Sequence, residues 1–483
     1  MTNLSLLDKE IREATEENVL SSFQEDSFQR NQLVMNFVHQ LSNAQGPLSI
    51  SLDAPWGSGK TFFVKQAKML IDGIDLKDEF WEKIRTNMRD EDVARIQDMI
   101  PVYYDAWWND NDTDPILSIL YSIAENEEIK ERANVPKNLD LGKAKDTLGN
   151  ILCLAADAGI SPLASKALKG MKGVVDSWTG PELFNAYKKQ QKANKCLRSV
   201  IEEFFVDIRE SYCYAINLDE KEQELSRKKI IVFIDELDRC RPDFAVRLLE
   251  RIKHYADLPN VIFVMSTNLT ELQYMIRNVY GDGFGAVRYL DRFFDIHMML
   301  PEIQDHILFE RFDIFRNAME DVSLRGVISF FKMSLREISR YLKWYKIVKM
   351  PDSQLVNPEF QNGWRLCKYY IFPYMIALKL TDLTRYQLFI SGDSKEADVF
   401  ASFIAEVMPH GIMKNFFPDN SDSNDTPEKR RAAIIKEIER ILTALWHTDA
   451  IWNTDDDMYK NECITVCRSY GTTMMSRLSL LAN

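Results

Sequence analysis

The stretch from residue 48 to residue 72 constrains the fold of this chain more than any other part of its sequence. Apolar residues and serines alternate over 48–52, a pattern typical of a β-strand. The next segment, APWGSG at 54–59, is glycine-rich and predicts a tight turn. Residues 60–72 then predict a helix. A strand, a glycine-rich turn and a helix in direct succession indicate a parallel α/β unit.

The turn has the spacing of a phosphate-binding loop, GxxxxGK[ST], with Ala54 in place of the first glycine. Its glycines allow successive backbone N–H groups to face phosphate oxygens, and the following helix adds the positive end of its dipole. We expect Lys60 to neutralise the β- and γ-phosphates and Thr61 to place its hydroxyl on Mg²⁺. The residues expected to contact the nucleotide are Pro55, Trp56, Gly57, Ser58, Gly59, Lys60, Thr61 and Phe62. The alternative is an ordinary strand-to-helix turn with an exposed lysine.

A second motif supplies the acids that such a loop needs. The run Ile230–Ile234 is β-branched and aromatic throughout, as expected of a strand buried on both faces, and Asp235 and Glu236 follow it. We expect Asp235 to hold Mg²⁺ and Glu236 to act as general base toward the attacking water. Two carboxylates after an apolar strand can instead cap a helix, and that alternative stays open for this motif taken alone.

Further strands are predicted at 102–104, 261–265 and 296–300, with a helix at 244–255. Helices that alternate with buried strands predict an α/β fold, a P-loop NTPase parallel sheet sandwiched by helices. Lys60 and Asp235 lie much farther apart than the ~30 residues of one strand–helix–strand unit, so a helical insertion is expected between them. The expected divisions are a helical extension at 1–25, a core at 26–124 and 229–301, an insertion at 125–228, a helical lid at 302–380 and a helical C-terminal region at 381–483. The first forty or so residues are expected to be helical up to Asn43.

Candidate groups for sensing the γ-phosphate are less distinctive. Asn268 follows the strand at 261–265, where a sensor is expected, but Asn is also a favoured helix N-cap. Arginines that stabilise transition-state charge are a common part of such sites. The candidates here are Arg288, Arg292, Arg336 and Arg340. Three tryptophans near the motifs, Trp56, Trp107 and Trp108, are interpreted as core aromatics.

Composition excludes several classes of protein. A net charge of −13 and a pI near 5.2 disfavour extensive binding to nucleic acid or to anionic membranes. These values do not exclude a local basic channel. The seven cysteines form no disulfide framework and no CxxC pair. No secretory signal and no apolar stretch of about 20 residues is found, so we expect a cytoplasmic protein without a membrane span.

The chain resembles the KAP family of P-loop NTPases, a branch of the additional-strand, catalytic-glutamate class. The most specific segment is KIIVFIDELDRCRPD at 229–243, which is similar to the IDDLDRC-like signature of that family. The other matching segments are DSFQR at 26–30, PWGSGKT at 55–61, YDAW at 104–107, YLDRFF at 289–294 and LREISRYL at 335–342.

The resemblance implies that Arg292 is an arginine-finger-like residue and that Arg336 is a lid sensor. Asp238 and Arg239 belong to the family signature without an assigned role, and a local salt bridge is the plain interpretation. Many members carry membrane-spanning helices in the insertion. This chain has charged residues there instead, so by the resemblance we expect a soluble member. Those charges are Asp157, Lys166, Lys169 and Lys172. Bacterial members are often linked to anti-phage defence.

Two functions follow from these motifs. The first is an ATPase that uses ATP and Mg²⁺ and acts as a nucleotide-driven switch or assembly component, with a homo-oligomer or an effector protein as partner. The second is an ATP-bound scaffold that does not hydrolyse and recruits an effector. Glu236 favours turnover, because a pure binder needs no base beside the metal. A GTPase is disfavoured because no NKxD motif follows the second acid.

Overall fold

The sheet is built from the five predicted strands, all parallel, in the order β2-β3-β4-β1-β5. The strands are β1 (Leu48–Asp53), β2 (Met99–Asp105), β3 (Lys229–Asp235), β4 (Val261–Thr267) and β5 (Ile296–Met299). Strand β4 therefore lies between β1, which leads into the glycine-rich turn, and β3, which ends at Asp235. Because all strands run in one direction, their carboxyl ends meet at one edge of the sheet.

The computed structural model describes most of the chain. The described residues are 14–26, 28–112, 114–125, 142–157, 180–213, 218–255, 257–303, 307, 318–348, 365–408, 436 and 476–479. They fall into two units, one spanning Glu13–Glu302 and a second that contains the described helices from residue 318 onward. The insertion charges at Lys166, Lys169 and Lys172 lie outside the described residues.

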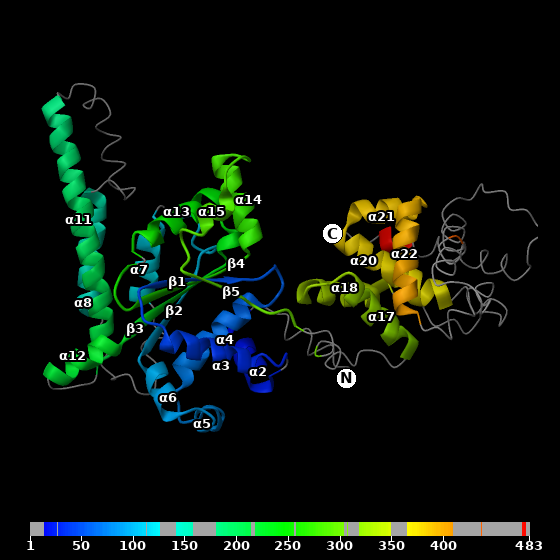
Figure 1. Ribbon diagram of the computed structural model, residues 1–483, viewed down its shortest axis with the longest axis horizontal. Helices are drawn as coiled ribbons and strands as arrows, with labels where there is room; N and C mark the ends of the chain where they lie inside the picture. The colour runs from blue at the N-terminus through cyan, green and yellow to red at the C-terminus, as the bar shows by residue number, and fades with distance from the viewer. Residues whose placement is uncertain are drawn as a thin grey trace, which may run out of the picture. The chain divides into compact units, whose positions relative to one another are not determined.

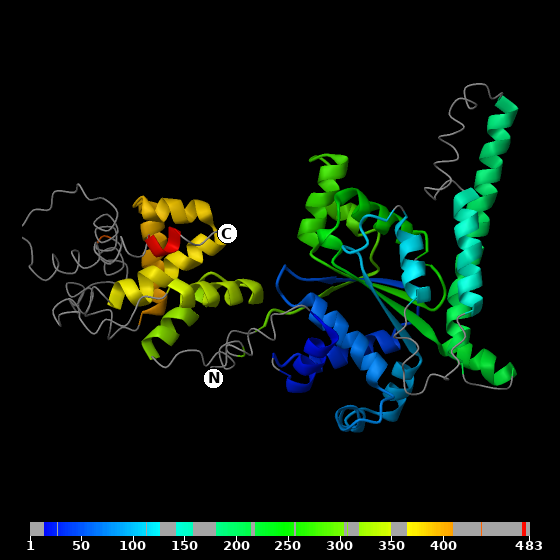
Figure 2. The same ribbon diagram turned by 180° about the vertical axis from the view of Figure 1, so that it is seen from behind.

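Helices cover both faces of the sheet in the first unit (Figures 1 and 2). One face carries α2 (Glu16–Glu25), α3 (Asn31–Asn43), α4 (Lys60–Gly73), α5 (Glu79–Thr86) and α6 (Asp90–Gln97). The other carries α7 (Pro115–Glu125), α13 (Pro242–Lys253), α14 (Leu269–Tyr280) and α15 (Ala286–Leu290). This is the predicted helix–sheet–helix sandwich, and the fold class is confirmed.

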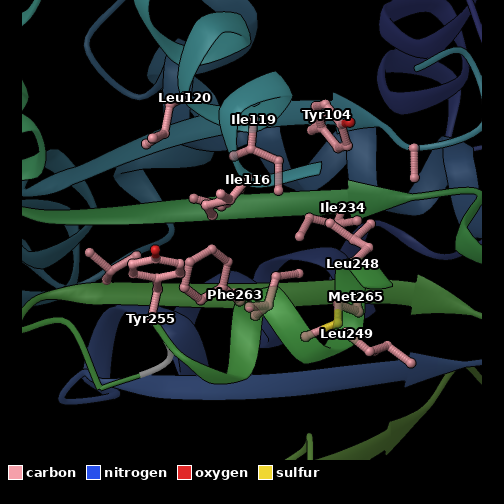
Figure 3. Packing of buried hydrophobic residues seen from close by; sticks show 14 of the residues in the cluster. Tyr104, Ile116, Ile119, Leu120, Ile234, Leu248, Leu249, Tyr255, Phe263 and Met265 are labelled. Carbon is pink, nitrogen blue, oxygen red and sulfur yellow. The ribbon is translucent and has the colours of Figure 1, made fainter. Parts of the chain in front are cut away.

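Alternate residues of each central strand supply the two cores. In β3, Val232 and Ile234 join the core beneath α7 and α13, whereas Phe233 joins the core beneath α3 and α4. Figure 3 shows the first core, where Ile234 packs with Leu248 and the aromatic rings of neighbouring elements. A strand buried on both faces explains the unbroken apolar sequence of β3.

The region between the two motifs is helical where it is described. Helices α8 (Gly142–Asp157), α11 (Gly180–Ser211) and α12 (Leu218–Arg227) lie there. Residues of α11 such as Ile201, Phe204 and Ile208 belong to the same core as β2 and β3. The insertion is therefore joined to the core through α8 and the C-terminal half of α11, while the other end of α11 extends away from the sheet (Figures 1 and 2). Among the helices that the structure describes, none has both the length and the apolar character needed to cross a bilayer.

The helix that the sequence predicts up to Asn43 is present in the described part as two separate helices, α2 and α3. The helix is interrupted between α2 and α3, where Asp26 and Gln29 have left-handed backbone angles, φ 46° and 51°. The Asp26 carboxylate accepts a hydrogen bond from the Asn31 backbone N–H and so starts α3. A short polar side chain satisfies the new helix end, which hydrophobic periodicity alone does not reveal.

The second unit is all helical in its described part. Its elements are α17 (Ala318–Phe330), α18 (Leu335–Val348), the π-helical turn Cys367–Ile371, α20 (Phe372–Thr381), α21 (Leu383–Ile390) and α22 (Ser394–Val407). Aromatic rings hold these helices together, with Tyr374 against Phe389, Phe400 and Phe403. The polar run DNSDSND at 419–425, which the sequence predicts to be a loop, lies outside the described residues.

Candidate active site

The glycine-rich turn has the backbone of a phosphate loop. Gly57 and Gly59 have φ of 78° and 88°, a region that residues with a side chain rarely adopt. Lys60, the first residue of α4, is only 8% exposed, and its ammonium donates to the Ala54 carbonyl at 2.5 Å. The loop is closed on itself through the same lysine that was predicted to meet phosphate.

An arginine from outside the motif supports this loop. The Arg30 guanidinium donates to the Ser58 carbonyl at 2.7 Å and to the Pro301 carbonyl at 2.8 Å. Burial lowers the pKa of Arg30 to about 10, so the group is still charged at neutral pH. Sequence reasoning had noted Arg30 only within the family resemblance and had given it no role.

Asp235 ends β3 at the carboxyl edge of the sheet. Its side chain is 1% exposed, and Oδ2 accepts a 3.1 Å hydrogen bond from the Tyr103 hydroxyl. Oδ1 has no hydrogen-bond partner among the described residues. Burial raises the pKa of Asp235, while nearby hydroxyls, including that of Thr61, act in the opposite direction. A buried carboxylate with one oxygen unsatisfied is suited to binding a cation or its water.

Glu236 follows in a left-handed conformation, φ 61°, which turns its side chain toward the phosphate loop. Oε1 accepts a 2.9 Å hydrogen bond from the Thr61 hydroxyl, and Oε2 forms an ion pair with Arg239 Nε. Burial, followed by the charge of Asp235, raises the pKa of Glu236, and Arg239 opposes this. The two predicted motifs therefore meet through Thr61 and Glu236.

Two hydroxyls between these motifs were missed by sequence reasoning. Ser266 and Thr267 end β4, the strand between β1 and β3, and both are fully buried. Neither hydroxyl makes a hydrogen bond of ordinary geometry within the described residues, although Ser266 lies near the Asp235 carboxylate. The available signal was a pair of hydroxyl residues at the end of an otherwise apolar strand.

Asn268 caps a helix, which is the alternative to a sensor role that the sequence left open. Its side-chain oxygen accepts from the backbone N–H groups of Thr270 and Glu271 at 3.1 and 3.4 Å, so it is the N-cap of α14. A role as γ-phosphate sensor stays a prediction.

The four candidate arginines are exposed and lie on two separate units. Arg288 is on α15, and Arg292 follows that helix, where its backbone carbonyl accepts from the Lys253 ammonium at 2.5 Å. Arg336 and Arg340 are on α18 in the second unit. Their predicted roles in catalysis are untested.

The interpretation of three tryptophans as core aromatics is wrong. Trp56, Trp107 and Trp108 are 46%, 53% and 84% exposed. The Trp108 backbone N–H donates to the Asp105 carboxylate at 2.9 Å, in the turn that follows β2. Of the remaining loop residues, Pro55 is exposed, and Phe62 is half-buried on the first turn of α4.

The donor set fits a magnesium nucleotide. The structure brings together the Thr61 hydroxyl, the Asp235 carboxylate and the Lys60 ammonium, which are oxygen ligands and a counter-charge for phosphate. Within the described residues, no cluster of three or more acidic, His or Cys side chains forms an all-protein metal cage. Mg²⁺ commonly binds to only one or two protein oxygens together with substrate phosphates.

The parallel sheet, the glycine-rich turn on β1 and the acids on β3, with one strand between them, define a P-loop NTPase domain of the additional-strand type. The model of the KAP family P-loop domain matches residues 30–347, which is more than half of the chain. The chain belongs to the KAP family. None of the curated proteins compared with it matches.

Proposed function

We propose that this protein binds ATP with Mg²⁺ and hydrolyses the γ-phosphate. The observation that carries the proposal is the 2.9 Å hydrogen bond between Thr61 and Glu236, which places the predicted metal ligand beside the predicted base. ATP is favoured over GTP because the chain lacks a guanine-reading NKxD motif after the second acid.

Each residue has a defined part in this proposal. Lys60 leaves the Ala54 carbonyl and neutralises the β- and γ-phosphates, while backbone N–H groups of residues 57–61 hold the phosphate oxygens. Thr61 and Asp235 hold Mg²⁺, which when bound withdraws charge from the phosphates. Glu236 accepts a proton from water as the water oxygen attacks the γ-phosphorus, and the bond from this phosphorus to the β–γ bridging oxygen breaks, so that ADP leaves. The backbone after β3 holds the carboxylate in position.

One observation favours the alternative of a slow or non-hydrolysing scaffold. Both carboxylate oxygens of Glu236 have partners, Thr61 and Arg239. These two contacts stabilise the carboxylate anion and act to lower the pKa of Glu236, so they oppose its protonation. The structure is therefore consistent with a resting state, and the two functions differ in whether nucleotide releases Glu236.

Phosphate release from ATP and GTP, measured beside direct ATP binding, separates these functions. We expect Lys60→Ala to abolish binding, and Glu236→Gln to keep binding while slowing hydrolysis by roughly 10²- to 10⁴-fold. Equal, slow phosphate release by wild type and Glu236→Gln, with ATP bound to both, would establish the scaffold. An absence of ATP binding to the wild type would refute both functions.

We further propose that the nucleotide cycle switches an oligomer or an effector protein, with Arg292 acting across a subunit boundary. Arg292 is exposed, as such a role requires. Arg292→Ala should then keep ATP affinity and lose turnover, and mixing it with Lys60→Ala should restore part of the activity. Size measurement with and without ATP tests assembly directly. We also propose a cytoplasmic location, and a role in anti-phage defence is the setting that the family resemblance favours.

A further inference from the structure

Asp238 is a buried carboxylate that the proposed mechanism does not use. It lies in the single 3₁₀ turn Leu237–Arg239, directly after Glu236, and is 1% exposed. Its Oδ2 accepts a 2.5 Å hydrogen bond from the Trp56 indole N–H, and the Lys60 ammonium lies 3.6 Å from the same oxygen. The turn after the acids thus reaches back to the phosphate loop.

The pairing of Asp238 with Lys60 has an electrostatic consequence. A buried carboxylate needs a cation or several donors, and Lys60 is the cation within 4 Å of Asp238 in the described part of the chain. The same ammonium is the group that we expect to neutralise nucleotide phosphate. Two anions therefore compete for one buried lysine.

We propose that Asp238 is a positioning residue that holds Lys60 and Trp56 in the nucleotide-free arrangement, and that incoming phosphate has to displace its carboxylate from Lys60. This inference rests on the proposed function, because it assigns a regulator of affinity to the same site. Asp238 lowers the affinity for nucleotide in two ways. It occupies the ammonium before binding, and its negative charge repels phosphate afterwards.

The sign of this effect distinguishes Asp238 from a merely structural residue. Asp238→Asn keeps an oxygen that can accept the Trp56 N–H but removes the charge that pairs with Lys60. We expect ATP to bind roughly ten-fold more tightly, the size of one partly screened charge pair. The gain should be smaller for ADP, because ADP brings one phosphate fewer to Lys60. A structural residue, once replaced, would weaken binding of both nucleotides.

Trp56 provides a second variant with the opposite sign. Trp56→Phe removes the indole donor but leaves the Asp238 carboxylate, which then depends more strongly on Lys60. We expect ATP to bind about three-fold more weakly, since the lost group is one hydrogen bond to a charged acceptor. Asp243→Asn is the matched control, because Asp243 is an exposed carboxylate on α13 that pairs with Arg247 of the same helix.

The test is calorimetric titration of the full chain with ATP and ADP in excess Mg²⁺, with thermal unfolding to confirm that each variant is folded. Tighter ATP binding by Asp238→Asn, with Asp243→Asn unchanged, supports the proposal. Equal or weaker binding by folded Asp238→Asn overturns it. If that variant does not fold, unchanged or tighter binding by Trp56→Phe overturns it instead. Binding by wild type but not by Lys60→Ala would support nucleotide binding at this loop whatever the result for Asp238, whereas a wild type without ATP binding would refute both proposals.

Discussion

The hydroxyl of Thr61, on the first turn of α4, donates to the Glu236 carboxylate that follows β3, at 2.9 Å. These residues are far apart in sequence, and the parallel sheet brings them together because both lie at the carboxyl edge of their strands. The hydroxyl gives its hydrogen to Glu236, so the lone pairs of its oxygen are left to bind Mg²⁺ as proposed.

The proposed role of the Thr61 hydroxyl as a Mg²⁺ ligand predicts how Thr61 variants behave. Thr61→Val keeps the shape of the side chain and removes the hydroxyl, so we expect the Mg²⁺-dependent gain in ATP affinity to fall by about ten-fold or more. Thr61→Ser keeps the hydroxyl and should stay within about three-fold of wild type. Titration with ATP at fixed Mg²⁺ and in EDTA measures the gain. The same gain in Thr61→Val as in wild type would show that this hydroxyl is not a ligand.

Tyr103 is expected to tune Asp235. Its hydroxyl donates to Asp235 Oδ2, so Tyr103→Phe removes a fixed partner and should raise the Mg²⁺ concentration needed for half-maximal ATP binding by several-fold, up to about ten-fold. Tyr104→Phe is the control, because Tyr104 points to the opposite face of β2 and donates to Ser118 instead. Both variants should lose about 1 kcal/mol of stability. An equal change in Mg²⁺ dependence in both variants would contradict the assignment.

Asn268 separates capping from catalysis. As the N-cap of α14, Asn268→Ala should lower the free energy of unfolding by about 1 kcal/mol, whereas Asn268→Asp should preserve it because Asp also caps well. Chemical denaturation checks the stability, and phosphate release under folding conditions checks turnover. If capping is its whole role, both variants hydrolyse ATP at the wild-type rate. Slower hydrolysis by folded Asn268→Asp would show a catalytic role for the amide.

Arg30 is expected to hold the phosphate loop in shape. Two different nitrogens of the Arg30 guanidinium donate to the Ser58 and Pro301 carbonyls, and the single nitrogen of a lysine does not reproduce this fork, so Arg30→Lys should weaken ATP binding by about ten-fold and lower stability by roughly 1–3 kcal/mol.

Arg85 offers a matched control for Arg30, because it also bridges two carbonyls, those of Ile74 and Leu76, far from the loop in sequence. Arg85→Lys should lower the melting temperature without changing ATP affinity. Equal ATP affinities for the two variants would mean that Arg30 contributes only stability.

The strands and the two motifs could be predicted because their signals are local. Unbroken β-branched runs mark β3 and β4, and the spacing of Gly57, Gly59 and Lys60 marks the loop. The order of the strands had no local signal, so only the family resemblance implied an additional strand, and the structure places β4 there.

The unpredicted parts depend on contacts between distant residues. The ion pair between Lys60 and Asp238 joins two turns whose sequences give no sign that they lie together. The hydrogen bond from Arg30 to Pro301 likewise joins residues that are 271 positions apart in the sequence. Ser266 and Thr267 belong to no spaced motif. Their buried hydroxyls become candidate site groups only because β4 lies between β1 and β3 in the sheet. The exposure of Trp107 and Trp108 is likewise a property of the folded turn after β2, which composition cannot show.

The proposed mechanism depends most on the Mg²⁺ ion that Asp235 holds beside the phosphates. Its direct test is calorimetric titration of wild type and Asp235→Asn with ATP, each in the presence of Mg²⁺ and again in EDTA. We predict that Mg²⁺ tightens ATP binding to the wild type at least ten-fold and has little effect on Asp235→Asn, while the two proteins bind ATP equally in EDTA. An equal gain from Mg²⁺ in both proteins would contradict the account.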